Sequence, residues 1–287
     1  MLPRIDALAR LSTAPLWGRI LAFLGLLLLI LLLLSLVVPL VIPNPTGATI
    51  GVMVSFYLLF LLYLQIWGHS VHGIPAVLRH YGMGWNRANG RDLLVGLGLS
   101  LAIVALLFSM QGALGWLEWQ IDPTEIPALV GEGALLGIAV GIAEELLFRG
   151  WLLDEMERDW LPNRAVWGST TVFAVLHFLK PLDVILQTLP QFLGLLLLGV
   201  VLACAKQRTR QLGLAIGLHS GLVWGYYLVD VGDWVVYGDR ISPWVTGINN
   251  NPLAGAIGIV ALVALWQGIR RYPKPATKDK PQRTGLE

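Results

Sequence analysis

Long apolar runs separated by short polar segments dominate the chain. A helix needs about 20 apolar residues to cross the hydrocarbon core of a bilayer, and about eight runs meet that length. We therefore predict an all-α fold: a polytopic membrane helix bundle of about eight transmembrane helices. The predicted spans are 17–42, 47–67, 92–117, 132–156, 163–179, 184–205, 212–230 and 252–270.

The basic residues predict the orientation of these spans. Lys and Arg collect at the N-terminus, in every second loop and in the C-terminal tail, whereas only Lys180 and Arg240 occupy the loops between. Cytoplasmic loops carry the excess of Lys and Arg. We expect cytoplasmic N- and C-termini and an even number of spans.

The composition supports one integral membrane domain. The chain has 287 residues, of which 56% are hydrophobic and 13% charged, and its mean hydropathy is +0.69. We assign residues 1–271 to the membrane domain and 272–287 to a polar cytoplasmic tail that we expect to be disordered. The lone Cys204 excludes an intrachain disulfide.

These features also predict the partners and the location. The net charge of +2 is small, and the basic residues mark topology rather than a nucleic-acid surface. The expected partner is the lipid bilayer, with no nucleic acid, and the expected location is a cell membrane or an internal membrane, crossed several times.

Three charged residues interrupt the fourth apolar run, in the segment G-I-A-E-E-L-L-F-R-G. Each of Glu144, Glu145 and Arg149 costs about 2.5–3.5 kcal/mol on insertion scales, so such a cluster indicates a function. Glu145 and Arg149 are spaced to pair on one helix face, which leaves Glu144 unpaired and available as a base or a ligand. Mutual pairing as a bundle staple is the structural alternative.

Two histidines in later spans complete the polar set. His177 closes the segment F-A-V-L-H of the fifth span. The turn near 160–162 lies about midway between Glu144 and His177, so an antiparallel hairpin places the two at one height. His219, in the seventh span, points away from the glycine ladder of its own helix and is expected at a similar depth.

A carboxylate base, a paired Glu and Arg, and two histidines suit the activation of water for attack on a peptide carbonyl. Glu144, His177 and His219 are also a plausible zinc set with an open position for water. The sequence leaves both the zinc-bound water and the directly held water open.

These motifs resemble the CAAX-processing and bacteriocin-processing (CPBP, or Abi) family of intramembrane endopeptidases. The family patterns are E-E-x-x-x-R, F-x-x-x-H and H-x-x-x-N/D, and the resemblance covers about 132–224, within a family-like catalytic core of about 132–230. It implies a helical bundle with a cytoplasm-facing cavity. Glu144 and His177 would activate water, and the third motif would stabilise the oxyanion. The substrate would be a membrane-associated or lipidated protein or peptide.

One position departs from the family pattern. Val223 stands where the third motif has Asn or Asp, and loss of an oxyanion donor costs about 2.7–4 kcal/mol in the transition state. Ser220, Trp224 or His219 could compensate. The alternative is a catalytically weak or inactive relative that acts as a membrane scaffold or binding protein.

Other functions explain fewer residues. A dyad of Ser220 with His177 leaves Glu144, Glu145 and Arg149 unexplained. The Gly-Asp pairs at 232–233 and 238–239 lie in an outside loop, and a transporter would show repeated halves. A metal site at His69 and His72 is less favoured than a solvated interfacial face.

Overall fold

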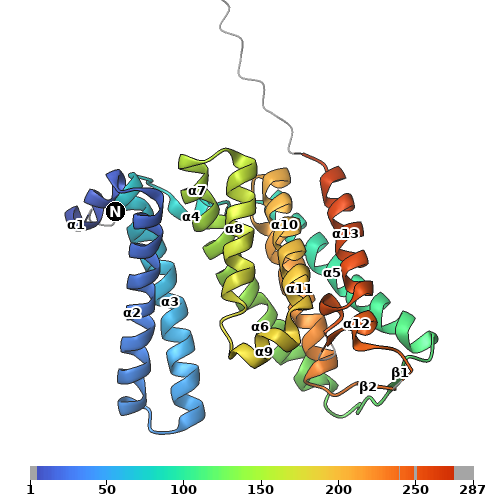
Figure 1. Cartoon of the computed structure of the whole chain (residues 1–287). Coiled ribbons are helices and arrows are strands. Elements are labelled where there is room, and N and C mark those ends of the chain that lie inside the picture. The colour runs from blue at the N-terminus through green and yellow to red at the C-terminus, as the bar shows by residue number, and fades with distance from the viewer. Residues whose placement is uncertain (1–4, 239, 249–250, 275–287) are drawn as a thin grey trace, which may run out of the picture.

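The computed structural model describes residues 5–238, 240–248 and 251–274. In these residues the chain is a bundle of helices with one small sheet, in which β1 (Leu117–Trp119) pairs antiparallel with β2 (Val235–Tyr237) (Figure 1). The all-α prediction is thus confirmed. The helices in chain order are α1 Asp6–Ala9, η1 Arg10–Thr13, α2 Leu16–Val41, α3 Pro45–His72, α4 Val77–His80, α5 Arg87–Ala113, α6 Ile126–Glu145, η2 Leu146–Leu152, α7 Leu153–Asp159, α8 Pro162–Leu176, α9 Leu182–Thr188, α10 Pro190–Thr209, α11 Gly213–Asp230, α12 Pro243–Thr246, η4 Pro252–Ala254 and α13 Ala256–Arg271.

Five helices of the described chain are long and apolar enough to cross a membrane. They are α2, α3, α5, the continuous run Ile126–Asp159 formed by α6, η2 and α7, and α10. The protein is therefore a multi-pass integral membrane protein. The other predicted spans, 163–179, 212–230 and 252–270, coincide with the shorter or less apolar helices α8, α11 and α13. The count of eight and the cytoplasmic side of the termini stay predictions.

One predicted span is divided into two helices. The run 184–205 contains Pro190, and the structure ends α9 at Thr188 and starts α10 at Pro190. Proline has no N–H to continue the hydrogen-bond ladder, but it fits the first turn of a new helix. The boundary between α2 and α3 has an equally local cause, because the Asn44 side chain accepts a hydrogen bond from the Gly47 N–H and caps α3.

Helix α11 is at the centre of the bundle, between α5 and α6. A Cβ at Gly137 of α6 would lie 2.7 Å from the carbonyl oxygen of Ser220, and one at Gly96 of α5 would lie 2.5 Å from that of Leu214. A Cβ at Gly217 would meet the α5 backbone at Leu93 and Leu97. Glycine therefore lets three helix backbones approach closely, which favours association in lipid. One face of α11 packs on α5, and His219 lies on a different face of the same helix.

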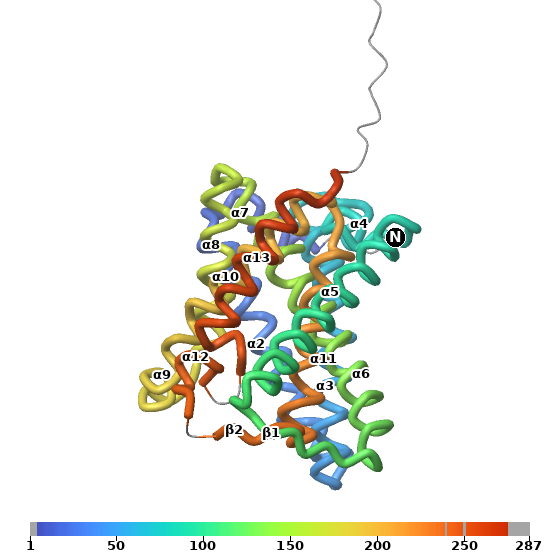
Figure 2. The backbone as a smooth tube through the Cα atoms, turned by 90° about the vertical axis from the view of Figure 1, so that its right-hand side faces the viewer, coloured from blue at the N-terminus to red at the C-terminus, as the bar shows by residue number. Residues whose placement is uncertain are grey.

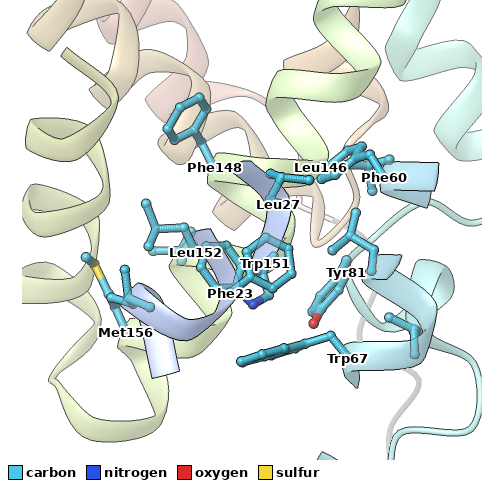
Figure 3. Close-up of a cluster of buried hydrophobic side chains, with 14 of the residues drawn as sticks. Phe23, Leu27, Phe60, Trp67, Tyr81, Leu146, Phe148, Trp151, Leu152 and Met156 are labelled. Carbon is cyan, nitrogen blue, oxygen red and sulfur yellow. The ribbon is translucent and has the colours of Figure 1, made fainter. Parts of the chain in front are cut away.

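The α2–α3 hairpin stands beside the rest of the bundle and meets it through an aromatic cluster (Figures 1 and 3). Phe23 of α2 stacks on Trp151 of η2 with ring centroids 3.7 Å apart, and Trp67 of α3 meets both rings edge-on. All three side chains are fully buried. The hairpin is thus packed against the helical segment that follows Glu145.

A buried ion cluster holds the same hairpin near the end of α7. Glu155 is fully buried and accepts hydrogen bonds from Arg19 Nε at 2.9 Å and Trp67 Nε1 at 2.9 Å. His72 Nε2 lies 2.6 Å from the same carboxylate, and Arg19 also pairs with Asp159. Because each charge of the cluster has a partner, the hairpin can bury it without a stranded ion.

The two views agree on the ends of the bundle (Figures 1 and 2). Helix α1 and the end of α13 lie at one end, and the β1–β2 sheet lies at the other. This arrangement agrees with termini on one side of the membrane. Residues 275–287 of the predicted tail lie outside the described residues.

Candidate active site

The two glutamates lie where a straight α-helix changes into a π-helix. Helix α6 ends at Glu145, and η2 (Leu146–Leu152) is a π-helix that carries Arg149. Segments of π-helix inside α-helices are frequent at functional sites because they change the direction of the side chains that follow. The sequence predicts one uninterrupted helix here, so the π-helix is a finding of the tertiary structure.

Glu145 and Arg149 form a buried ion pair. Arg149 Nη1 donates to Glu145 Oε1 at 2.8 Å, and the two side chains are 1% and 0% exposed. The guanidinium carbon lies 4.3 Å from the centre of the Phe173 ring. This is the pairing expected from the spacing, with an added cation–π contact from α8.

His219 of α11 is attached to this pair. Its Nδ1 lies 2.8 Å from Glu145 Oε1. Because the carboxylate only accepts hydrogen bonds, Nδ1 carries the proton, and Nε2 points to the other glutamate. His219 Nε2 lies 3.7 Å from Glu144 Oε2.

His177 of α8 also lies close to Glu144. It caps the end of α8, and its Nδ1 donates to the Phe173 carbonyl oxygen at 2.8 Å. Its Nε2 lies 3.5 Å from Glu144 Oε2. The height match expected from the hairpin α7–α8 is therefore realised.

The structure brings all five predicted polar residues together. Glu144 Oε2 lies within 3.7 Å of the Nε2 atoms of both histidines, and both rings are oriented by a hydrogen bond at Nδ1. The Glu144 side chain is 27% exposed, whereas Glu145 is fully buried. Glu144 is therefore the more accessible of the two carboxylates.

The three residues of the predicted zinc set lie close to one another. Glu144, His177 and His219 converge, yet the described residues contain no group of three or more His, Cys, Asp or Glu side chains placed to hold a metal ion. Glu144 Oε2 lies 3.5 Å and 3.7 Å from the Nε2 atoms of His177 and His219, and the zinc ion stays a prediction.

A cavity of about 340 Å³ opens at the two histidines. Phe173, His177, His219 and Val223 line it at the site, and Asp230 and Pro252 line its far end. It therefore extends along α11 toward the end with the β1–β2 sheet. The cavity implied by the family resemblance faces the cytoplasm instead, so the two differ in direction if the termini are cytoplasmic.

Helix α10 supplies two contacts that sequence reasoning missed. The Gly199 carbonyl oxygen accepts from Arg149 Nη2 at 3.4 Å, and Lys206 Nζ donates to the Arg149 carbonyl oxygen at 2.6 Å. The charge pattern of the sequence identifies Lys206 only as a topology marker. No local pattern links it to a residue far away in the sequence, so only its position in an apolar run could have drawn attention to it.

The competing candidates are not assembled into sites. Ser220 Oγ is buried against Gly141 without a hydrogen-bond partner in the described chain, and no Ser220–His177 hydrogen bond is found there. His72 joins Glu155, whereas His69 lines a separate cavity. Asp239 of the second Gly-Asp pair lies outside the described residues.

The fold and the site together define an integral membrane protein with a Glu–His centre enclosed by its helices. Residues 126–225 match the family model Rce1-like, described as type II CAAX prenyl endopeptidase Rce1-like. This segment contains all five site residues, and the resemblance to the CAAX-processing endopeptidases that the motifs indicated is confirmed over it. No curated protein and no solved structure matches the chain.

Proposed function

We propose that the protein is an intramembrane endopeptidase that hydrolyses a peptide bond with a water molecule activated by Glu144 and His177. The observation that carries the proposal is the position of Glu144 Oε2, 3.5 Å and 3.7 Å from the Nε2 atoms of His177 and His219. The match of 126–225 to the type II CAAX prenyl endopeptidase model supports the reaction class.

The first step uses two hydrogen-bond acceptors to orient the water. His177 donates its Nδ1 proton to the Phe173 carbonyl, so its neutral ring presents an accepting lone pair at Nε2. A water bound to Nε2 and to the Glu144 carboxylate directs its oxygen lone pair at the substrate carbonyl. Glu144 removes one proton while the water oxygen bonds to the carbonyl carbon.

The second step breaks the peptide bond. Glu144 returns the proton to the amide nitrogen, the C–N bond breaks, and the products are an amine and a carboxylic acid that ionises. His219 in its protonated form donates from Nε2 to the oxyanion, while Glu145, paired with Arg149, accepts at Nδ1. Val223 cannot supply the additional donor that the family motif places four residues after the histidine.

The proposed substrate is a membrane-associated or lipidated protein or peptide, cut near the cytoplasmic face. The position of Glu144, Glu145 and Arg149 on the membrane-length run Ile126–Asp159 supports a substrate that enters from the bilayer. The family model is described by its action on CAAX prenyl substrates. The proposed steps need no metal ion, and the zinc prediction is tested by measuring the zinc content of active protein and its response to a chelator.

The test is cleavage of a prenylated C-terminal peptide in proteoliposomes by the wild type and by Glu144→Gln and His177→Ala. General acid–base catalysis contributes about 10²–10⁴-fold, and we expect losses of this size in both variants. Glu132→Gln is the matched control, because Glu132 lies on the same helix and contacts Tyr227 rather than the site. Cleavage that persists in both site variants would contradict the mechanism.

A further inference from the structure

A second polar cavity lies away from the Glu–His centre, between the end of α3 and the segment that contains α4. Its volume is about 480 Å³. The polar side chains on its wall are Gln65 and His69 of α3 and Arg79 of α4, and no acidic residue lines it. The proposed peptidase reaction uses none of them.

The three polar side chains come from two helices that border the same cavity. Gln65 and His69 are four residues apart and share one face of α3. Arg79 lines the same cavity and is exposed, and no ion pair of its guanidinium is found within the described ranges of the chain. Neighbouring acids are engaged elsewhere, since Asp154 pairs with His80 and Arg158. The cavity wall therefore carries the Arg79 guanidinium, the His69 imidazole and the Gln65 amide, whose Nε2 also donates to the Leu61 carbonyl oxygen at 3.3 Å, and no carboxylate lines it.

The cavity also lies at the level expected for lipid headgroups. Gln65 and His69 are in the last two turns of the membrane-length helix α3. Trp85, which lines the same cavity, is 98% exposed, and exposed tryptophans collect at the membrane–water interface. The remaining wall is apolar, with Val77 and Leu78 among its residues. A donor-rich pocket with an apolar wall at this level suits a phosphate attached to an acyl chain.

We propose that this cavity binds the phosphate headgroup of an anionic phospholipid, held chiefly by Arg79. Basic pockets at the cytoplasmic side of membrane helices bind such headgroups. Arg79 also lines a smaller cavity of about 410 Å³ that includes Gln211, so the same side chain is on the wall of both cavities.

Lipid binding here has a structural consequence for the catalytic helix. Tyr81 follows α4 and is fully buried, and its Cβ lies 3.2 Å from the position that a Cβ would take at Gly150 of the π-helix. A lipid that orders α4 therefore orders a segment packed on η2. We expect the bound anionic lipid to raise the thermal stability of the protein.

The test is native mass spectrometry of the full chain in detergent containing equal amounts of phosphatidylglycerol and phosphatidylcholine. The wild type should retain phosphatidylglycerol preferentially, and Arg79→Gln should bind it about fivefold more weakly, the effect of one charge near a membrane surface. Arg79→Lys should keep most of the binding and shows that the position tolerates substitution. Arg87→Gln is the matched control, because Arg87 is an exposed arginine at the start of α5, close in sequence to Arg79, and lines neither cavity.

Three outcomes would overturn the proposal. The first is a wild type that shows no preference between the two lipids. The second is an equal loss of phosphatidylglycerol binding in Arg79→Gln and Arg87→Gln, which would indicate attraction by the overall surface charge rather than by this cavity. The third is displacement of the lipid by millimolar inorganic phosphate, which would assign the cavity to a small soluble anion. Thermal stabilisation by phosphatidylglycerol that is lost in Arg79→Gln but kept in Arg87→Gln supports it independently.

Discussion

Replacing Arg149 by Met strands the charge of Glu145 inside the bundle. The two side chains are 1% and 0% exposed, and their ion pair measures 2.8 Å. Removal of one partner of a buried pair costs about 3–5 kcal/mol because the remaining charge stays desolvated. His219 Nδ1 also donates to Glu145. We therefore expect Arg149→Met to lower the free energy of unfolding by an amount near the lower end of that range.

The double variant Glu145→Gln/Arg149→Met separates this cost from lost packing. Removing both charges leaves no stranded ion, and exchange of a buried pair for neutral residues is often close to neutral. The amide carbonyl that replaces the Glu145 carboxylate can still accept a hydrogen bond from His219. The double variant should therefore be more stable than Arg149→Met, although it carries one more substitution.

The assay is equilibrium unfolding by SDS in mixed micelles, which reports the free energy of unfolding. Arg158→Met is the matched control, because Arg158 and Asp154 have the same i,i+4 spacing but side chains that are 32% and 21% exposed. An exposed pair contributes about 0–1 kcal/mol. The reasoning is refuted if Arg149→Met unfolds like Arg158→Met, or if the double variant is less stable than Arg149→Met.

Two further predictions concern the surroundings of the site. Lys206→Met leaves the Arg149 carbonyl without its charged donor. A hydrogen bond to a charged group contributes about 1.5–3 kcal/mol to the free energy of unfolding. The substitution should lower kcat for peptide cleavage with little change in KM, and an unchanged kcat would contradict the positioning role. Val223→Asn adds a donor beside His219 on the cavity wall and should raise kcat by up to about 10²-fold. A kcat that does not rise would show that the cavity wall cannot present the donor to the oxyanion.

Much of the fold was predictable because lipid imposes simple requirements. Helices of the structure coincide with all the predicted spans, since a backbone in hydrocarbon must satisfy its own hydrogen bonds. Errors arose at boundaries. The predicted span 184–205 is interrupted at Pro190, and the run predicted as 132–156 extends over Ile126–Asp159.

The five polar residues of the site could be predicted from the sequence, but the contacts from other helices that hold them in place could not. Charged residues inside apolar helices stand out from any sequence, and helical spacing alone pairs Glu145 with Arg149. The contacts from Gly199 and Lys206 to Arg149 could not be predicted, because they join residues that are distant in sequence and depend on how α10 packs on η2.

The sequence by itself determined the membrane class, the helical fold and the five polar residues, because hydrophobic length and the cost of buried charge act locally along the chain. Only the tertiary structure decided that α6 gives way to a π-helix after Glu145. It also decided that Glu144 Oε2 lies close to two imidazole Nε2 atoms and that the cavity at the histidines extends along α11 toward the sheet. These features follow from close packing between helices, where glycine contacts of α11 set the distances that no single segment contains.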